Sequence, residues 1–249
     1  MRVRWQKRLP SHGPWALLPV SAEGQARVQQ DETVRIFVSR VFACPAEVAE
    51  QVLGRGRLRS FERQAMILRQ GDWLTLTYLL ILGRAHALLY AAEGQIILLH
   101  EFGPGDMFGT LGEIAAVRQD ADVVAVDEVR ALALESGDLA LLAQQYGSIG
   151  LALSRMLLKR LRQTTERMYE RAALSAIGRV YSELLRQARG RADMAIRPAP
   201  VIADLALRVS TTRETASRAI NGLERRGIIR RDGDGLTIVA PSRLEELVL

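Results

Sequence analysis

A chain of 249 residues that is 48% hydrophobic and 25% charged is expected to fold into two modest domains, and this composition excludes disordered and fibrous proteins. Its formal net charge of +6 is compatible with a polyanionic partner such as nucleic acid. The single cysteine, Cys44, cannot form an internal disulfide or hold a metal centre alone, and the longest uncharged apolar run, Trp73 to Gly83, is too short to span a membrane, so we expect a cytoplasmic protein with no metal and no membrane partner.

The first half of the chain is predicted to be an extension followed by a β-rich domain. Residues 1–32 begin with basic residues, and the apolar stretch WALLPV that follows is too short and proline-broken for a secretory signal. We therefore interpret residues 1–32 as an N-terminal extension. Over residues 33–145, short apolar runs separated by Gly, Asp and Pro predict a compact β-roll, with a short leading helix from Pro45 to Gln51.

Residues 146–172 change to a helical period. Apolar or small side chains recur at spacings of four, four, three and four, and they predict one face of a long amphipathic helix: Leu153, Leu157, Leu161, Thr164 and Met168. This face would be buried against the same helix of a second copy, which makes it a predicted dimer seam. The alternative is that it packs onto the β-roll of its own chain.

Residues 173–249 form a separate basic module, since residues 175–249 contain thirteen Arg against nine acidic residues. We predict a helix from Ala172 to Gln187, a short helix from Ile202 to Val209, and a tight turn before a helix that ends near Arg225. A capping box of the form S/T-x-x-E, Thr211 to Glu214, would begin that last helix.

The last of these helices carries a polar face suited to base reading. Its inner side would be Thr215, Ala216, Ala219, Ile220 and Leu223, and its outer side Arg213, Glu214, Ser217, Arg218 and Asn221. An Arg fork can donate two bonds to guanine, and a Glu can accept one from cytosine. The alternative is an ordinary charged helix face, on which Glu214 serves only the cap and pairs with Arg218.

The segment after this helix favours the DNA-reading interpretation. Gly227 would end the helix, and the sequence IIRRDGDGLTIV predicts two strands joined by a turn over Asp232 to Gly235. Arg230 and Arg231 on the first strand would contact phosphates. The module is therefore predicted to be a winged helix-turn-helix.

Over residues 33–245 the sequence resembles the CRP/FNR family of bacterial transcription regulators. The resemblance rests on RQGD at Arg69 to Asp72, Gly83 after a strand, GPGDMFG at Gly103 to Gly109, the long helix, and STTRETASR at Ser210 to Arg218. It implies an α+β protein with an N-terminal jelly-roll-like β-roll that resembles a cyclic-nucleotide-binding domain, a long dimerisation helix and a C-terminal winged helix-turn-helix.

The resemblance also implies which residues would meet double-stranded DNA. The base-reading positions are Arg213, Glu214 and Arg218, and a homodimer would place its two recognition helices about 34 Å apart on a near-palindromic operator. The remaining predicted DNA contacts, to the backbone or nearby groups, are Ser210, Thr211, Thr212, Ser217, Asn221, Arg230 and Arg231. RNA polymerase is a further candidate partner.

The sensor segment departs from the cyclic-AMP pattern of the family. Members that bind the nucleotide use a Glu for the ribose and an Arg followed by Ser or Thr for the phosphate, whereas Thr110, Gln119 and Asp120 stand at those positions here. A register shift would bring Arg118 or Glu113 into the site. The candidate pocket is Thr110, Leu111, Gly112, Glu113, Arg118, Gln119, Asp120, Thr164 and Thr165; the last two match a hydroxyl pair that meets adenine in relatives and are otherwise plain seam residues.

The leading hypothesis is thus a homodimeric, sequence-specific DNA-binding regulator with no resident cofactor. A small-molecule effector remains open, but cyclic AMP bound in the usual manner is not expected. The strand residues His86 and His100 are interpreted as packed side chains rather than haem ligands. The alternative function is a cyclic-nucleotide- or dinucleotide-binding module whose winged helix contacts proteins; no motif of an enzyme is present.

Overall fold

The computed structural model describes residues 32–90, 96–110 and 117–248, so the predicted extension over residues 1–32 lies almost wholly outside the described part. The described chain opens with two helices, α1 (Glu32–Phe42) and α2 (Ala46–Arg55). The first of these was missed by the sequence analysis, which placed β structure from Thr33 onward, and the second is longer than predicted. Val34, Val38 and Phe42 lie four residues apart and are all buried, which is the helical spacing that the short apolar runs nearby obscured.

A β-roll follows, as predicted. One sheet has the order β1-β10-β4-β7, a second has the order β2-β9-β5-β6, and β3 pairs with β8. Every pairing in the two main sheets is antiparallel. The strands are β1 (Gly56–Phe61), β2 (Met66–Leu68), β3 (Trp73–Leu74), β4 (Leu76–Leu82), β5 (Ala85–Tyr90), β6 (Ile96–Phe102), β7 (Met107–Gly109), β8 (Val117–Arg118), β9 (Asp122–Ala125) and β10 (Val129–Glu135).

Two glycines of the roll are required by their backbone conformation. Gly83 has a φ of +84° between β4 and β5, and Gly109 has a φ of +94° at the end of β7. A Cβ at either position would also overlap a backbone carbonyl oxygen, that of Glu128 for Gly83 and that of Leu76 for Gly109. The resemblance motifs that contain these glycines therefore mark tight turns in the roll.

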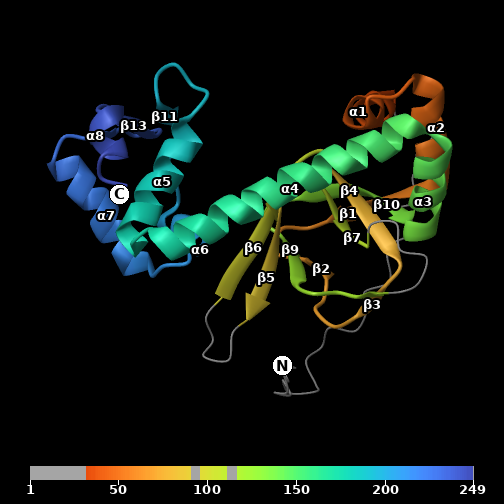
Figure 1. The fold of residues 1–249 in the computed structure, drawn as a ribbon, viewed down its shortest axis with the longest axis horizontal. Helices are drawn as coiled ribbons and strands as arrows, with labels where there is room; N and C mark the ends of the chain where they lie inside the picture. The colour runs from red at the N-terminus through yellow and green to blue at the C-terminus, as the bar shows by residue number, and fades with distance from the viewer. Residues whose placement is uncertain (1–31, 91–95, 111–116, 249) are drawn as a thin grey trace.

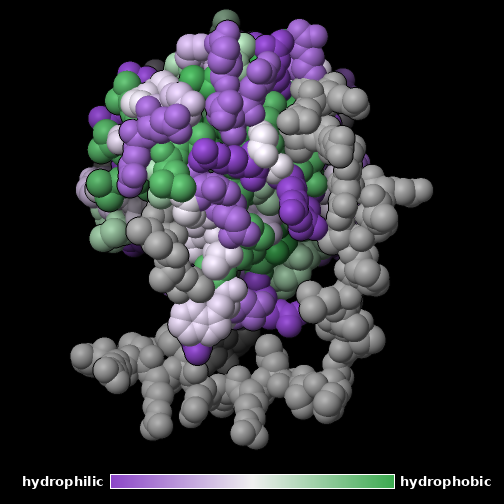
Figure 2. Space-filling model, turned by 90° about the vertical axis from the view of Figure 1, so that its right-hand side faces the viewer, coloured by the Kyte–Doolittle hydropathy of each residue, from purple (hydrophilic) through white to green (hydrophobic). Residues whose placement is uncertain are grey.

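The roll continues through α3 (Ser136–Gln145) into α4 (Gly147–Ala173), a helix of 27 residues. At 1.5 Å per residue α4 is about 40 Å long, and Figure 1 shows it running from the helical end of the roll to the C-terminal domain. Its first turns are anchored in the roll, where Ile149 and Ala152 are buried. Figure 2 views the molecule from the α1–α3 end and shows hydrophilic and hydrophobic side chains interspersed there, as on an ordinary solvated surface.

The C-terminal domain is a three-stranded sheet, of order β11-β13-β12, combined with four helices. The predicted helix from Ala172 to Gln187 is in fact the end of α4 and a separate helix. The long helix ends before Leu174, and a new helix starts because the Ser175 side chain caps it by accepting a hydrogen bond from the Gly178 amide at 3.0 Å. The elements are α5 (Ala176–Ala188), β11 (Ala195–Ile196), α6 (Ile202–Arg208), α7 (Arg213–Arg225), β12 (Ile229–Arg231), β13 (Leu236–Ile238) and α8 (Pro241–Glu245).

Each half of the molecule has its own apolar core. The C-terminal core is built around Leu184, Leu205, Ile220 and Leu223, each no more than 1% exposed. The chain is therefore an α+β protein with a β-rich N-terminal domain, a long connecting helix and a C-terminal helix-turn-helix domain. Among the described helices, none has both the length and the apolar character that a lipid bilayer would require.

Candidate nucleic-acid interface and sensor pocket

The helix α7 begins one residue later than the predicted capping box. The Thr212 side chain, not that of Thr211, accepts a hydrogen bond from the Thr215 backbone amide at 3.1 Å, and it also bonds the Thr215 hydroxyl at 3.0 Å. Glu214 is consequently the second residue of the helix and not the reciprocal member of the box. The cap fixes Arg213 and Glu214 in the first turn, where backbone amides face outward.

The outer face of α7 carries exposed charged side chains. Arg213, Glu214 and Arg218 are all exposed, whereas Ala216, Ala219, Ile220 and Leu223 on the inner side are buried in the domain core. The described side chains of Arg213, Glu214 and Arg218 form no hydrogen bond or ion pair with one another. The Glu214–Arg218 pairing considered as an alternative is therefore not formed, and the three groups extend into solvent.

The turn before α7 is held by two arginines from outside the motif. The Arg179 guanidinium on α5 donates to the backbone oxygens of Val209 at 2.9 Å, Leu174 at 3.0 Å and Ser210 at 3.3 Å. Arg171 at the end of α4 donates to the Ser210 hydroxyl at 2.9 Å. Ser210 has a φ of +51°, so these contacts stabilise a left-handed residue at the tight turn.

The wing is formed by β12 and β13 beside the end of α7. Arg230 is exposed, as is Asn221 on α7. Arg231, however, pairs with Glu224 and donates to the Asn221 amide oxygen at 3.0 Å, and its hydrogen bond to Glu224 raises its pKa. Two of the predicted DNA contacts, Asn221 and Arg231, thus bind each other, while Ser217 is half-buried and Thr212 serves the cap.

The described residues of the predicted phosphate segment have the following contacts. Thr110 is 5% exposed, and its hydroxyl donates to the Leu76 carbonyl at 3.3 Å. The Gln119 amide donates to the Ala121 carbonyl at 3.0 Å, and Asp120 is exposed. Arg118 lies over the Trp73 ring at 5.0 Å. The other members of the predicted segment, Leu111, Gly112 and Glu113, lie outside the described residues.

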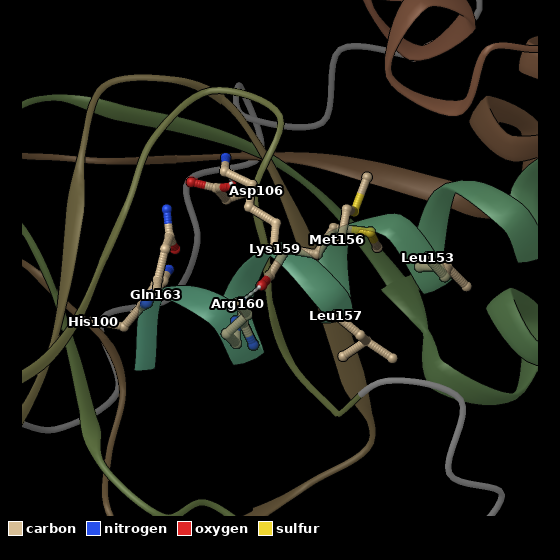
Figure 3. A pocket seen from close by; sticks show the side chains of 9 residues that line it. His100, Asp106, Leu153, Met156, Leu157, Lys159, Arg160 and Gln163 are labelled. Carbon is tan, nitrogen blue, oxygen red and sulfur yellow. Dashed lines mark hydrogen bonds and ion pairs between the residues drawn. The ribbon is translucent and has the colours of Figure 1, made fainter. Parts of the chain in front are cut away.

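A cleft lies between α4 and the turn from β6 to β7 (Figure 3). Sequence reasoning had assigned two of its residues, Leu153 and Leu157, to the seam and did not identify the rest as pocket residues. A signal existed on α4, where Met156, Arg160 and Gln163 recur at helical spacing on the side facing the roll. The lining is His100, Asp106, Met107, Leu153, Met156, Leu157, Lys159, Arg160 and Gln163.

The cleft has a cationic floor and an acidic edge. Arg160 donates to the Met107 carbonyl and stacks on the Phe102 ring at 5.2 Å, and burial lowers its pKa despite the nearby Asp106 carboxylate. The Lys159 ammonium lies 3.3 Å from the Asp106 carboxylate, and Figure 3 shows these two labelled side chains next to each other. Burial, reinforced by the charge of Arg160, lowers the pKa of His100 to about 4. The imidazole is therefore neutral at pH 7, and the arginine is the charge that a bound anion would meet.

The side of α4 next to the cleft leaves apolar side chains exposed, and Leu157 belongs to both surfaces. Leu157, Leu161 and Met168 are 50%, 62% and 67% exposed, and Thr164 is exposed beside them. Leu153, by contrast, is half-buried against the core of the roll. Thr165 is also exposed, and its hydroxyl donates back to the Leu161 carbonyl at 2.9 Å. Neither threonine is among the residues that line the cleft.

The two histidines considered for haem ligation have other contacts. His86 is buried and contacts Glu101 at 2.8 Å through Nε2, and His100 lies beside the Phe102 ring at the cleft. In the part of the chain that the structure describes, no group of three or more His, Cys, Asp or Glu is placed to hold a metal ion.

Comparison with known proteins agrees with this organisation. Residues 58–146 match the family described as Cyclic nucleotide-binding domain, and residues 178–247 match the one described as Crp-like helix-turn-helix domain. A relative from Mycobacterium tuberculosis strain H37Rv, named CRP-like cAMP-activated global transcriptional regulator, is 28% identical over 189 residues, which cover 74% of this chain and 84% of the relative.

Two further comparisons extend over more of the chain. The Cyclic AMP receptor protein of Thermus thermophilus is 27% identical over 206 residues, or 82% of this chain and 93% of that protein. A solved structure of a CooA mutant from Carboxydothermus hydrogenoformans shares the fold with a TM-score of 0.71 at 16% identity, covering 90% of this chain and 99% of the other. With both family matches in this order along one chain, the protein belongs to the CRP/FNR family of transcription regulators.

Proposed function

We propose that this protein binds specific double-stranded DNA sequences as a homodimer and thereby regulates transcription. The observation that carries the proposal is the exposed face of α7, where Arg213, Glu214 and Arg218 extend from the first two turns of a capped, well-packed helix. Donors and an acceptor at this spacing can read base edges in the major groove. Arg230 on the wing and the hydroxyls of Ser210, Thr211 and Ser217 near the turn are assigned to the DNA backbone.

The base-reading assignment is tested with Arg218→Ala in a fluorescence anisotropy assay at fixed salt. We expect the affinity for a selected operator to fall about 10- to 100-fold and the affinity for random DNA to change much less. Arg225→Ala is the matched control, because Arg225 is an exposed arginine at the other end of the same helix. Equal losses on operator and random DNA would reduce Arg218 to a phosphate contact, and no sequence preference at all would favour a module whose winged helix contacts proteins.

The homodimer is assigned to the outer face of α4. Leu157, Leu161 and Met168 form an exposed apolar stripe, with Thr164 between them, on a helix that reaches the DNA-binding domain. Burying this stripe against a second copy would remove apolar surface from water and place two recognition helices about 34 Å apart, as a near-palindromic operator requires. Leu153 packs within its own chain and contributes to the seam only at its edge.

Analytical ultracentrifugation tests the dimer. Leu161→Glu would place a charge in the centre of the seam, so we expect the dimer dissociation constant to rise at least about 100-fold, equivalent to roughly 3 kcal/mol. Leu141→Glu is the control, since Leu141 is an equally exposed leucine, 56% accessible, on α3. If the wild-type protein is monomeric, or if the two variants have the same dimer dissociation constant, α4 does not form the dimer interface.

We further propose that cyclic AMP does not bind this chain by the family's phosphate-binding arrangement. Gln119 and Asp120 supply no cation for a cyclic phosphate, and Thr110 is occupied with a backbone carbonyl. The cleft on α4 offers Arg160 and Lys159 against one acid, Asp106, which favours a small anion. Calorimetry with cyclic AMP, cyclic GMP and cyclic di-GMP is the test, and cyclic AMP binding abolished by Gln119→Ala would contradict it.

The remaining assignments follow from the regulator class. The family comprises transcription regulators, and we propose that this chain acts without enzymatic chemistry, in the cytoplasm, with RNA polymerase as a further partner. A DNase-footprinting and transcription assay with purified polymerase would show whether occupancy of an operator changes promoter output. Unchanged output at full occupancy would remove the polymerase from the list of partners.

A further inference from the structure

The carboxylate of Glu101 in the β-rich domain binds an arginine of the helix-turn-helix domain. Glu101 on β6 accepts two hydrogen bonds from the Arg208 guanidinium on α6, one of them at 2.9 Å, and its second oxygen also contacts Nε2 of His86 at 2.8 Å. The side chains are 20%, 18% and 9% exposed for Glu101, Arg208 and His86. A two-point arginine–carboxylate contact that is largely removed from water fixes orientation as well as distance.

A weaker electrostatic interaction accompanies this contact. Asp204 is one helical turn before Arg208 on α6, and its negative charge acts on Arg84 of the roll. Arg84 in turn pairs with Asp127 at 2.7 Å. The charge of Asp204 thus adds to the Glu101–Arg208 contact without forming a separate ion pair with the roll.

Strand β6 also borders the sensor cleft. Neighbouring residues of a strand point to opposite faces, so His100 lines the cleft while Glu101 faces Arg208. The Leu99 carbonyl on the same strand accepts a hydrogen bond from Arg167 of α4 at 3.2 Å. Three consecutive residues of β6 therefore have three different partners. Leu99 contacts the long helix, His100 lines the cleft, and Glu101 contacts the helix-turn-helix domain.

We propose that Glu101 is a positioning residue for DNA binding: its contact with Arg208 holds the helix-turn-helix at a fixed orientation, and β6 links that contact to the sensor cleft. The inference rests on the DNA-binding function proposed above and assigns a regulatory contact to it. With the contact closed, Arg213, Glu214 and Arg218 are exposed, so the held orientation is compatible with reading DNA. Without the Glu101–Arg208 contact the helix-turn-helix domain would sample many orientations. Binding to an operator with two half-sites would then cost the entropy of fixing one orientation, which lowers the affinity.

A charge-exchange cycle tests the proposal with the full chain and a selected operator. We expect Glu101→Arg and Arg208→Glu each to weaken operator binding about tenfold, and the double exchange to return it to within about threefold of the wild type. The matched control is the pair Arg35 and Glu50, 3.7 Å apart on α1 and α2, whose exchange should leave operator affinity unchanged. Glu101→Gln removes the charge with the smallest change in shape, in case the reversed variant does not fold.

Direct electrostatics would give a different result. If Arg208 only attracted DNA phosphates and Glu101 only repelled them, the two single variants would shift affinity in opposite directions and their effects would add. Additive effects, or single variants that bind as well as the wild type, overturn the proposal.

Hydrogen exchange of the DNA-free protein gives an independent reading. Amides of α6 should exchange about tenfold faster in each single variant and recover in the double exchange, because docking protects them. Unchanged exchange overturns the positioning role. If the hydrogen-exchange results hold while neither the wild type nor any variant shows sequence preference in DNA binding, the proposed DNA-binding function is wrong. In that case the Glu101–Arg208 contact still positions the domain.

Discussion

The start of the recognition helix provides a sharp test of the structure. Thr212→Ala removes the oxygen that accepts the Thr215 amide and leaves that donor without its partner at the first turn of α7. Loss of such a cap costs about 1 kcal/mol, within a range of roughly 0.5–2 kcal/mol. For a domain of this size, about 1 kcal/mol lowers the Tm of its unfolding transition by roughly 4–8 °C. Fraying of this turn would also disorder Arg213 and Glu214, so operator affinity should fall with stability.

Differential scanning calorimetry distinguishes the observed cap from the one that the sequence predicted. Thr211→Ala is the control, because Thr211 contributes its backbone amide, bonded to the Ala206 carbonyl at 2.9 Å, rather than a cap oxygen. We expect it to cost less than about 0.5 kcal/mol. Thr212→Asp keeps an acceptor and adds a charge favourable at a helix N-terminus, so it should retain the Tm. A larger loss for Thr211→Ala than for Thr212→Ala would refute this reasoning.

Three further predictions concern stability. Leu184→Ala should cost about 2–5 kcal/mol in urea denaturation, because it opens a cavity at a side chain that is fully buried in the C-terminal core. Gly83→Ala should cost about 2 kcal/mol or more by the same measurement, since its φ is +84° and a Cβ would overlap a backbone carbonyl, whereas an alanine at the open position Gly222 of α7 should be tolerated. Burial raises the pKa of Glu101, but the His86 hydrogen bond and the Arg208 charge outweigh it and lower the pKa from 4.5 to about 2. The stabilisation, about 1–2 kcal/mol after screening by solvent, is therefore complete above about pH 4.5 and lost as the pH falls toward 2, so acid unfolding followed by circular dichroism should be steeper for the wild type than for Glu101→Gln.

Local signals explain why the helix-turn-helix and wing could be predicted. The Gly227 stop, the turn of Asp and Gly between two short strands, and the apolar inner face of α7 each act within a few residues. The helix α1 was missed although Val34, Val38 and Phe42 lie four apart, because its residues also fit the short apolar runs typical of strands. Its helical state is decided by burial against α2 and α4, which are distant or ambiguous in the sequence.

The binding surfaces were predicted less well than the elements, for two different reasons. The cap was placed one residue early because Thr211 is followed three residues later by Glu214, whereas the observed cap, Thr212, has Thr215 at that position and so lacks the glutamate of the pattern. The cleft was missed because its lining combines the β6–β7 turn with a helix some fifty residues later, and no local pattern records that approach. Arg160, buried and bonded to the Met107 carbonyl, looked like one of several charges on a solvated helix face.

The contacts along α4 suggest how a regulator of this build can change its signal without changing its DNA target. Arg160, Arg167 and Arg171 follow one another at seven and four residues, so they lie along one side of the helix. In order, they contact the cleft at Met107, strand β6 at Leu99, and the turn before α7 at Ser210. A ligand that competes for Arg160 therefore acts on the same rigid element that steadies the turn, whatever its chemistry. Under the functions proposed for α7 and for the cleft, substitutions at the cleft would alter the effector while the face that carries Arg213, Glu214 and Arg218 stays intact.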